Sequence, residues 1–169
     1  TIPAGQHQRR GHAFVPLPYL SSYDWMEYIP SAWMVTNGID LGGYATWRNP
    51  LYPAILGQIG EVIGYNEATW VLSSLCMSAT VFSAGLGARA LATPAAGMVA
   101  AITIPFINPW AEASRWATLY PMLTATTGLA LGFGAAYSRW GNPLFGAIAA
   151  GAAGLALGID FRGIALVVA

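Results

Sequence analysis

Charged residues are scarce in this chain, and lysine is absent from it. Only 8% of the residues are charged, whereas soluble domains carry about 25%, so the chain cannot cover a water-facing surface with charge. Acidic and basic residues balance to a net charge of zero, which gives no indication of nucleic-acid binding. With 56% hydrophobic residues and a mean hydropathy of +0.52, the composition predicts an integral membrane protein.

Cysteine is nearly absent as well. The single Cys76 lies inside an apolar stretch, so a disulfide or a thiolate metal cluster within the chain is excluded. We interpret Cys76 as a small packing residue. His7 and His12 have no clustered ligand residues, so no metal is assigned to them. No cofactor is predicted; a divalent metal ion is the open alternative, although no clustering of ligands indicates one.

Apolar runs separated by short polar breaks fill the second part of the sequence. A helix needs about 20 apolar residues to cross a bilayer, and the first and third runs meet this length well. The second and fourth are marginal, which favours buried positions within a bundle. The expected spans lie near residues 68–88, 91–107, 116–137 and 143–159, with a further run from Gly163.

These runs predict an all-α protein, a polytopic transmembrane helix bundle over residues 67–169. Residues 1–66 form a long first loop, whose lead segment, residues 1–20, has no apolar run of spanning length. Within the loop we expect a short interfacial helix from Asp24 to Asn37, because Trp and Tyr recur there at helical spacing. Ser21 suits its start and Gly38 its end. A second juxtamembrane helix is expected from about Pro50 to Gly60.

Small residues recur within the spans. Gly128-x-x-x-Gly132 and Gly154-x-x-x-Gly158 each place two glycines on one helix face. Such faces allow helices to approach closely, which drives association where lipid offers no hydrophobic gain. We interpret both motifs as packing motifs.

Two carboxylates stand at the start of the expected interfacial helix. Asp24 and Glu27 are three residues apart and therefore lie on one helix face. A carboxylate at a membrane surface can act as a general base when its surroundings tune it. The alternative is an acid in the first turn of a helix, favoured there by the helix dipole.

Other charged residues flank the expected spans, and each has two interpretations. Arg48 can clamp a phosphate through two hydrogen bonds, or can extend toward lipid phosphates like any interfacial arginine. Glu112 either pairs locally with Arg115 or contributes to a site. Asp160 and Arg162 either mark a functional site or anchor the end of the fourth span.

The order of these motifs resembles a known family. Asp24 begins Asp-x-x-x-Tyr, an Asn-Gly pair follows, and then comes Arg48-Asn-Pro-Leu-Tyr-Pro. This order resembles the N-terminal membrane portion of the GT-C glycosyltransferases, especially the dolichyl-phosphate-mannose protein mannosyltransferase and aminoarabinose-transferase branch. The segment from Gly154 to Arg162 is similar to a later family segment, a small-residue span that ends at a basic residue.

The resemblance implies an inverting enzyme that takes a sugar from a polyprenyl-phosphate donor. The catalytic aspartate of the family's first outer loop corresponds to Asp24, and it would deprotonate or orient the acceptor. Many members carry a second acid beside it; here Trp25 stands there and Glu27 is the nearest substitute. The expected substrate-binding residues are Arg48, Tyr52, Glu112 and Arg162.

The resemblance also implies a location and partners. It places the chain in a prokaryotic inner or plasma membrane with the long first loop outside the cytoplasm. The partners would be a lipid-linked sugar donor, membrane lipids and other integral membrane subunits, but no nucleic acid. An earlier span, later spans and a soluble C-terminal region would belong to the intact protein. A non-catalytic accessory subunit of a larger membrane complex, derived from the same fold, remains the alternative.

The four spans also predict which residues share a side. Because each span reverses sides, the first loop, the turn after the second span and the end of the fourth span lie toward one face. The residues expected on that face are Asp24, Arg48, Glu112 and Asp160.

Overall fold

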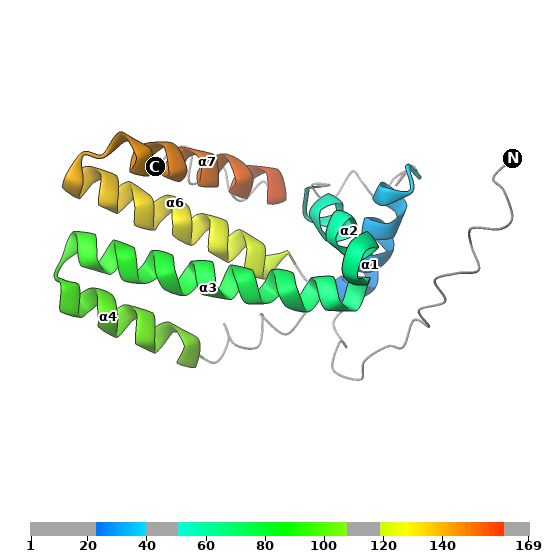
Figure 1. Cartoon of the computed structure of the whole chain (residues 1–169), viewed down its shortest axis with the longest axis horizontal. Helices are drawn as coiled ribbons and strands as arrows, with labels where there is room; N and C mark the ends of the chain where they lie inside the picture. Colours follow the sequence, from blue (N-terminus) through cyan, green and yellow to red (C-terminus); the bar gives the residue numbers. More distant parts are fainter. Residues whose placement is uncertain (1–22, 40–50, 108–118, 161–169) are drawn as a thin grey trace, which may run out of the picture.

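A computed structural model describes residues 23–39, 51–107 and 119–160, with side chains from Tyr28 onward. Throughout these ranges the regular structure is helical, so the all-α prediction is confirmed for them. The lead segment, Ser21 and the run from Gly163 lie outside the described residues. The elements in chain order are α1 (Tyr23–Thr36), α2 (Leu51–Ile63), α3 (Tyr65–Leu91), α4 (Pro94–Thr103), the short 3-10 helix η2 (Ile104–Phe106), α6 (Tyr120–Trp140) and α7 (Pro143–Ile159) (Figure 1).

Helix α1 ends where the sequence predicts, at a glycine in the left-handed conformation. Gly38 has a φ of 65°, which a residue without a β-carbon adopts at little cost. The amide of Gly38 donates to the carbonyl of Val35 at 3.1 Å, and the amide of Ile39 donates to that of Met34 at 2.9 Å. This pair of hydrogen bonds is the Schellman motif, which satisfies the last carbonyls of the helix.

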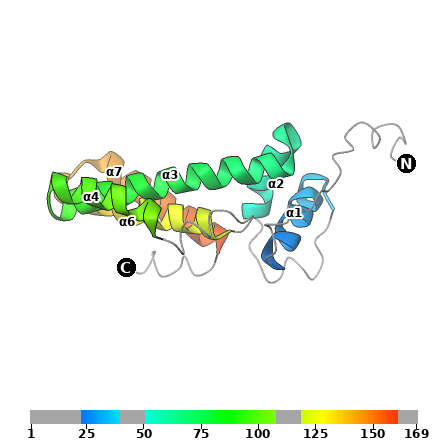
Figure 2. The ribbon, with the colours of Figure 1, turned by 90° about the horizontal axis from the view of Figure 1, so that it is seen from below.

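Helices α1 and α2 pack on each other and lie across one end of the bundle (Figures 1 and 2). Tyr28 of α1 meets Tyr52 of α2 edge to face, with ring centroids 5.1 Å apart. Gly57 lies against α1 so closely that a β-carbon there would collide with the Thr36 hydroxyl. The two helices of the first loop therefore form one packed unit.

The remaining helices lie side by side in the order α7, α6, α3 and α4 (Figure 1). Helix α3 begins beside α2 and α4 turns back along it. Helix α6 begins where Leu119 and Met122 join the core around Tyr52, and α7 returns until Gly158 faces Leu51. The starts of α3 and α6 and the end of α7 therefore lie at one end of the molecule. Asp160 directly follows α7, so it lies at the end that also holds the packed helices α1 and α2, as the sequence predicts.

The seam between α3 and α6 consists of small residues. Buried hydroxyls in it bond to their own helices: Thr80 Oγ1 donates to the carbonyl of Cys76 at 2.8 Å, and Ser83 Oγ donates to that of Thr80 at 3.0 Å. A β-carbon on Gly128 would lie 2.7 Å from Ser83 Oγ, so this Gly-x-x-x-Gly motif is confirmed as a packing motif. The buried α3 residues follow one helix face, and they are Ala68, Thr69, Leu72, Ser73, Cys76, Thr80, Ser83, Gly87 and Ala90.

The second glycine motif behaves differently. Gly158 is close to Leu51, where a β-carbon would lie 2.9 Å from its Cδ2 atom. Gly154, in contrast, faces open space, with no atom within 4 Å of where a β-carbon would be. Only one of its two glycines therefore takes part in packing among the described residues.

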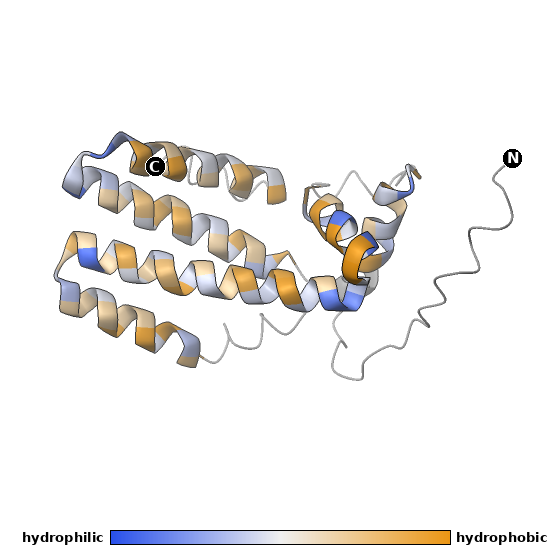
Figure 3. Ribbon diagram, viewed as in Figure 1, coloured by the Kyte–Doolittle hydropathy of each residue, from blue (hydrophilic) through white to orange (hydrophobic). Residues whose placement is uncertain are grey.

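Many large apolar side chains on α3, α4 and α6 are exposed. On α3, Leu75 is 62% exposed and Phe82 is 58% exposed. Phe106, at the end of η2, is 82% exposed. Figure 3 shows hydrophobic residues distributed along α3, α4, α6 and α7. A water-soluble protein buries most side chains of this kind, so the extensive apolar outer surface of α3 and α4 differs from the soluble pattern.

Among the described residues, α3 is the one helix that is both long and apolar enough to cross a membrane. Helix α6 has 21 residues but includes several threonines and glycines, and α4 and α7 are shorter. The expected run 91–107 is divided because Pro94 opens α4 and Pro105 falls in η2, where its missing amide disfavours a continuing α-helix. The crossings expected near 91–107, 116–137 and 143–159 stay predictions.

Candidate functional site at the acidic end

The two predicted catalytic residues fall at the start of α1. The helix begins at Tyr23, so Asp24 and Glu27 lie in its first turns. Their side chains are outside the described part of the structure. The predicted substrate ligands Arg48, Glu112 and Arg162 lie outside the described residues altogether.

Tyr52 is the predicted site residue that the structure describes fully. It is 2% exposed and lies in the apolar cluster that joins α1, α2, α3 and α6. Burial raises the pKa of the Tyr52 phenol far above its usual value near 10, and the nearby Cys76 and Tyr28 raise it further. The phenol is therefore neutral at physiological pH and packs α2 onto α1. Its predicted role in substrate binding stays a prediction.

A carboxylate that the sequence analysis did not single out lies beside this cluster. Glu61, near the end of α2, accepts a hydrogen bond of 2.8 Å from the hydroxyl of Tyr65 in the first turn of α3. The pair spans the junction of the two helices. Glu61 is also the single charged residue of α2, which is otherwise mostly apolar. A lone charge in an apolar helix is the sequence signal that indicates a candidate site residue here.

The junction between α2 and α3 turns at a single residue. Gly64 has a φ of 97°, a conformation that glycine tolerates and other residues avoid. The carboxylate of Glu67, in the first turn of α3, folds back over Gly64. A negative charge at this position is favoured by the exposed amides of a helix start.

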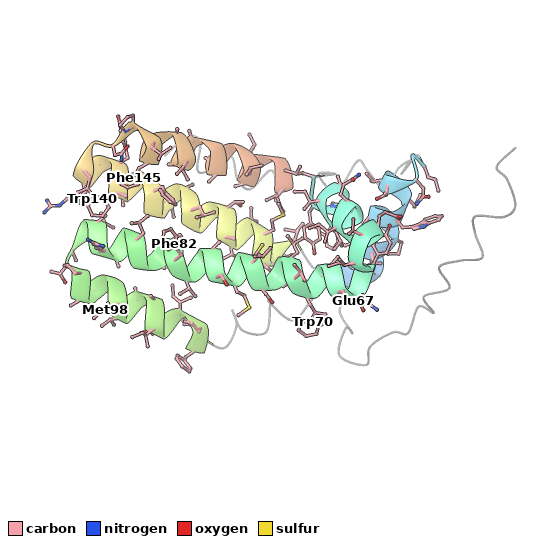
Figure 4. The ribbon with its side chains drawn as sticks, in the orientation of Figure 1. Glu67, Trp70, Phe82, Met98, Trp140 and Phe145 are labelled. Carbon is pink, nitrogen blue, oxygen red and sulfur yellow. The ribbon has the colours of Figure 1, made fainter. Side chains whose placement is uncertain are left out.

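Among the residues whose side chains the structure describes, acidic and basic groups lie at opposite ends. The described end formed by α1, α2 and the start of α3 holds Glu61 and Glu67, and Asp160 follows α7 at the same end. Arg89 and Arg139 stand at the opposite end, in the last turns of α3 and α6. Helix α3 separates the ends by about 40 Å, because its 27 residues rise about 1.5 Å each. Figure 4 labels Glu67 at one end and Trp140 at the other.

The chemistry available at this acidic end is that of carboxylates and phenols. Within the described ranges no three His, Cys, Asp or Glu residues group closely enough to hold a metal ion. Carboxylates can accept a proton or a hydrogen bond from a hydroxyl-bearing molecule.

Comparison with known protein families, with curated proteins and with solved structures finds no match. The resemblance to the GT-C glycosyltransferases therefore rests on the sequence motifs around Asp24 and Arg48.

Proposed function

We propose that this chain is a polytopic membrane-embedded helix bundle whose acidic end serves glycosyl transfer from a polyprenyl-phosphate donor. The observation that carries the membrane location is the reversed pattern of α3, with small and hydroxyl-bearing residues inside and large apolar residues outside. Lipid offers no hydrophobic gain for burying leucine or phenylalanine, whereas small residues let helices approach closely.

The neighbouring helices support the same location. Exposed Met98, Val99 and Ile102 on α4 and exposed Leu131 on α6 continue the apolar outer surface. The buried hydroxyls of Thr80 on α3 and Thr126 on α6 donate to carbonyls of their own helices, an arrangement that suits a medium without water. We therefore propose that α4, α6 and α7 accompany α3 through the bilayer, with α4 and α7 as the shorter helices of the group.

The catalytic part of the proposal rests on α1. Asp24 would take the proton of the acceptor hydroxyl as that oxygen attacks the sugar carbon, while the bond to the donor phosphate breaks with inversion. Glu27 would assist it. Arg48 and Arg162 would hold the departing phosphate, because a guanidinium bonds phosphate oxygens in pairs. The proposal includes an extracytoplasmic acidic end in a prokaryotic inner or plasma membrane.

Two measurements on the intact protein test these parts separately. Resistance to extraction by alkaline carbonate supports the membrane location, and release of the protein into the soluble fraction contradicts it. Transfer of labelled sugar from polyprenyl-phosphate donors, measured in membranes with and without the protein, tests the activity. Absence of transfer across several donors and acceptors contradicts the catalytic proposal.

An accessory role in a membrane complex is the second candidate, and one surface favours it. The outer face of α7 carries exposed small residues at helical spacing: Ala147, Ala150, Gly151 and Gly154. A β-carbon on Gly151 or Gly154 would have no described atom within 4 Å. Such a face fits close contact with another membrane helix. Substitution of Gly151 and Gly154 by leucine would then release partner subunits during purification in mild detergent, without affecting a purely catalytic monomer.

A further inference from the structure

Two arginines gather at the end of the molecule opposite the carboxylates. Arg89 lies in the last turn of α3 and Arg139 in the last turn of α6, and both are exposed. Within the described ranges neither pairs with a carboxylate, because Glu61, Glu67 and Asp160 belong to the other end. The end therefore carries positive charge without a counter-charge from the described chain.

Aromatic residues surround these arginines. The guanidinium carbon of Arg89 lies 5.8 Å from the centre of the Trp140 ring, so a cation–π contact joins the ends of α3 and α6. Trp140 packs in turn on Phe145 at the start of α7, with centroids 5.9 Å apart (Figure 4). Trp140 is 44% exposed and Tyr137 is 48% exposed. Aromatic rings of this kind favour the headgroup level of a bilayer.

The helix dipole alone does not account for the arrangement. Arginine in a last helical turn is favoured by the carbonyls there. However, α4 and α7 begin at this same end, capped by the side chains of Thr93 and Asn142, so helix starts and helix ends lie together. Their opposite partial charges offset one another, and the two guanidinium groups remain as the main charge of this surface.

We propose that Arg89, Arg139 and Trp140 form a binding surface for acidic phospholipid headgroups in the membrane leaflet that contains the α3–α4 and α6–α7 turns. This inference rests on the membrane location proposed above, but not on glycosyl transfer. The distance fits: the length of α3 matches a bilayer of about 40–45 Å including its headgroup regions. Guanidinium groups bind phosphate oxygens in a two-pronged geometry, and the exposed Arg89 lies against the half-exposed ring of Trp140.

The test compares two spin-labelled lipids around the intact protein reconstituted in phosphatidylcholine vesicles. The fraction of motionally restricted label gives the relative association of phosphatidylglycerol over phosphatidylcholine. We expect a preference for phosphatidylglycerol that falls about fivefold for each of Arg89→Gln and Arg139→Gln, the effect of one basic residue near an anionic surface. Arg89→Lys and Arg139→Lys keep the charge but not the two-pronged geometry, so each retains part of the preference. Glu67→Gln, at the opposite end, serves as the matched control and leaves it unchanged.

Each outcome has a separate meaning. An unchanged preference in the Arg89→Gln/Arg139→Gln double variant overturns the lipid surface. Loss of the preference on adding millimolar inorganic phosphate at constant ionic strength shows a site for free anions and also overturns it. Restricted lipid without any preference defeats this inference alone, whereas absence of restricted lipid with both labels defeats the proposed membrane location.

Discussion

Gly132 of α6 lies against the backbone carbonyl of Ser83 of α3, so that no side chain fits between the two helices. This contact sets the separation of α3 and α6 midway along the bundle. Ser83 itself is buried and donates its hydroxyl to the carbonyl of Thr80. The close packing of α3 on α6 therefore requires a residue without a side chain at Gly132. It also requires that the Ser83 hydroxyl form its hydrogen bond within α3.

Gly132→Ala is expected to destabilise the bundle. The added methyl group would collide with the Ser83 carbonyl, which is backbone and cannot rotate away; overpacking of this kind costs about 1–3 kcal/mol. Thermal unfolding of the detergent-solubilised protein measures the change. Gly134→Ala on the same helix is the matched control, because nothing lies within 4 Å of its added methyl group. Equal melting temperatures for both variants would contradict the close contact.

Tyr52 predicts a loss of stability at high pH. Burial keeps the folded phenol neutral above its ordinary pKa of 10.0, whereas the unfolded chain ionises there. The contribution of Tyr52 is therefore complete below about pH 10 and is lost progressively as the pH rises further. Chemical denaturation at pH 8 and above pH 10 measures it, with Tyr52→Phe as the reference. If stability falls equally with pH in Tyr52→Phe and in the parent, ionisation of Tyr52 is not the cause of the loss.

Labelling of single cysteines tests the arrangement of the ends. With Cys76 replaced by serine, the variants Ala92→Cys and Ser138→Cys place thiols at the arginine end, and Val62→Cys places one at the acidic end; all three positions are exposed. We expect Val62→Cys to react with an impermeant maleimide in intact cells, and the other two only after permeabilisation. Labelling of Ala92→Cys and Val62→Cys from the same side would contradict a crossing by α3.

Asp24→Asn is expected to abolish sugar transfer by the intact protein while leaving it folded. Asparagine keeps the shape and an oxygen suited to the start of a helix, so α1 loses little. It removes the negative charge that proton abstraction requires. The measurement is transfer of labelled sugar in membranes that contain equal amounts of each variant. Undiminished transfer would leave Asp24 with a structural role at the start of α1.

Arg48→Lys is expected to weaken donor binding more than folding. Lysine keeps the positive charge but lacks the planar fork that holds two phosphate oxygens at once. The concentration of polyprenyl-phosphate donor needed for half-maximal transfer should rise, while the melting temperature stays near that of the parent. A shift in melting temperature without any change in donor dependence would assign Arg48 to the interface instead.

The positions of several helices could be predicted because local signals set them. Apolar length marks α7 from Pro143 to Ile159, and Gly38 ends α1 through its positive φ. The hydrogen bond between Glu61 and Tyr65 could not be predicted, because it crosses the helix break at Gly64 and depends on how α2 meets α3. The burial of Tyr52 likewise arises from the packing of α1 on α2, which no spacing within either helix encodes.

The outward placement of Leu75, Phe82 and Phe106 bears on how this chain reaches its structure. In water, the hydrophobic effect stabilises a fold roughly in proportion to the apolar surface that folding removes from solvent. This bundle leaves much of its apolar surface outside, so an aqueous solvent would favour competing compact states that bury those side chains. Refolding into detergent or lipid should give one ordered bundle, whereas dilution into buffer should give collapsed and aggregated chains.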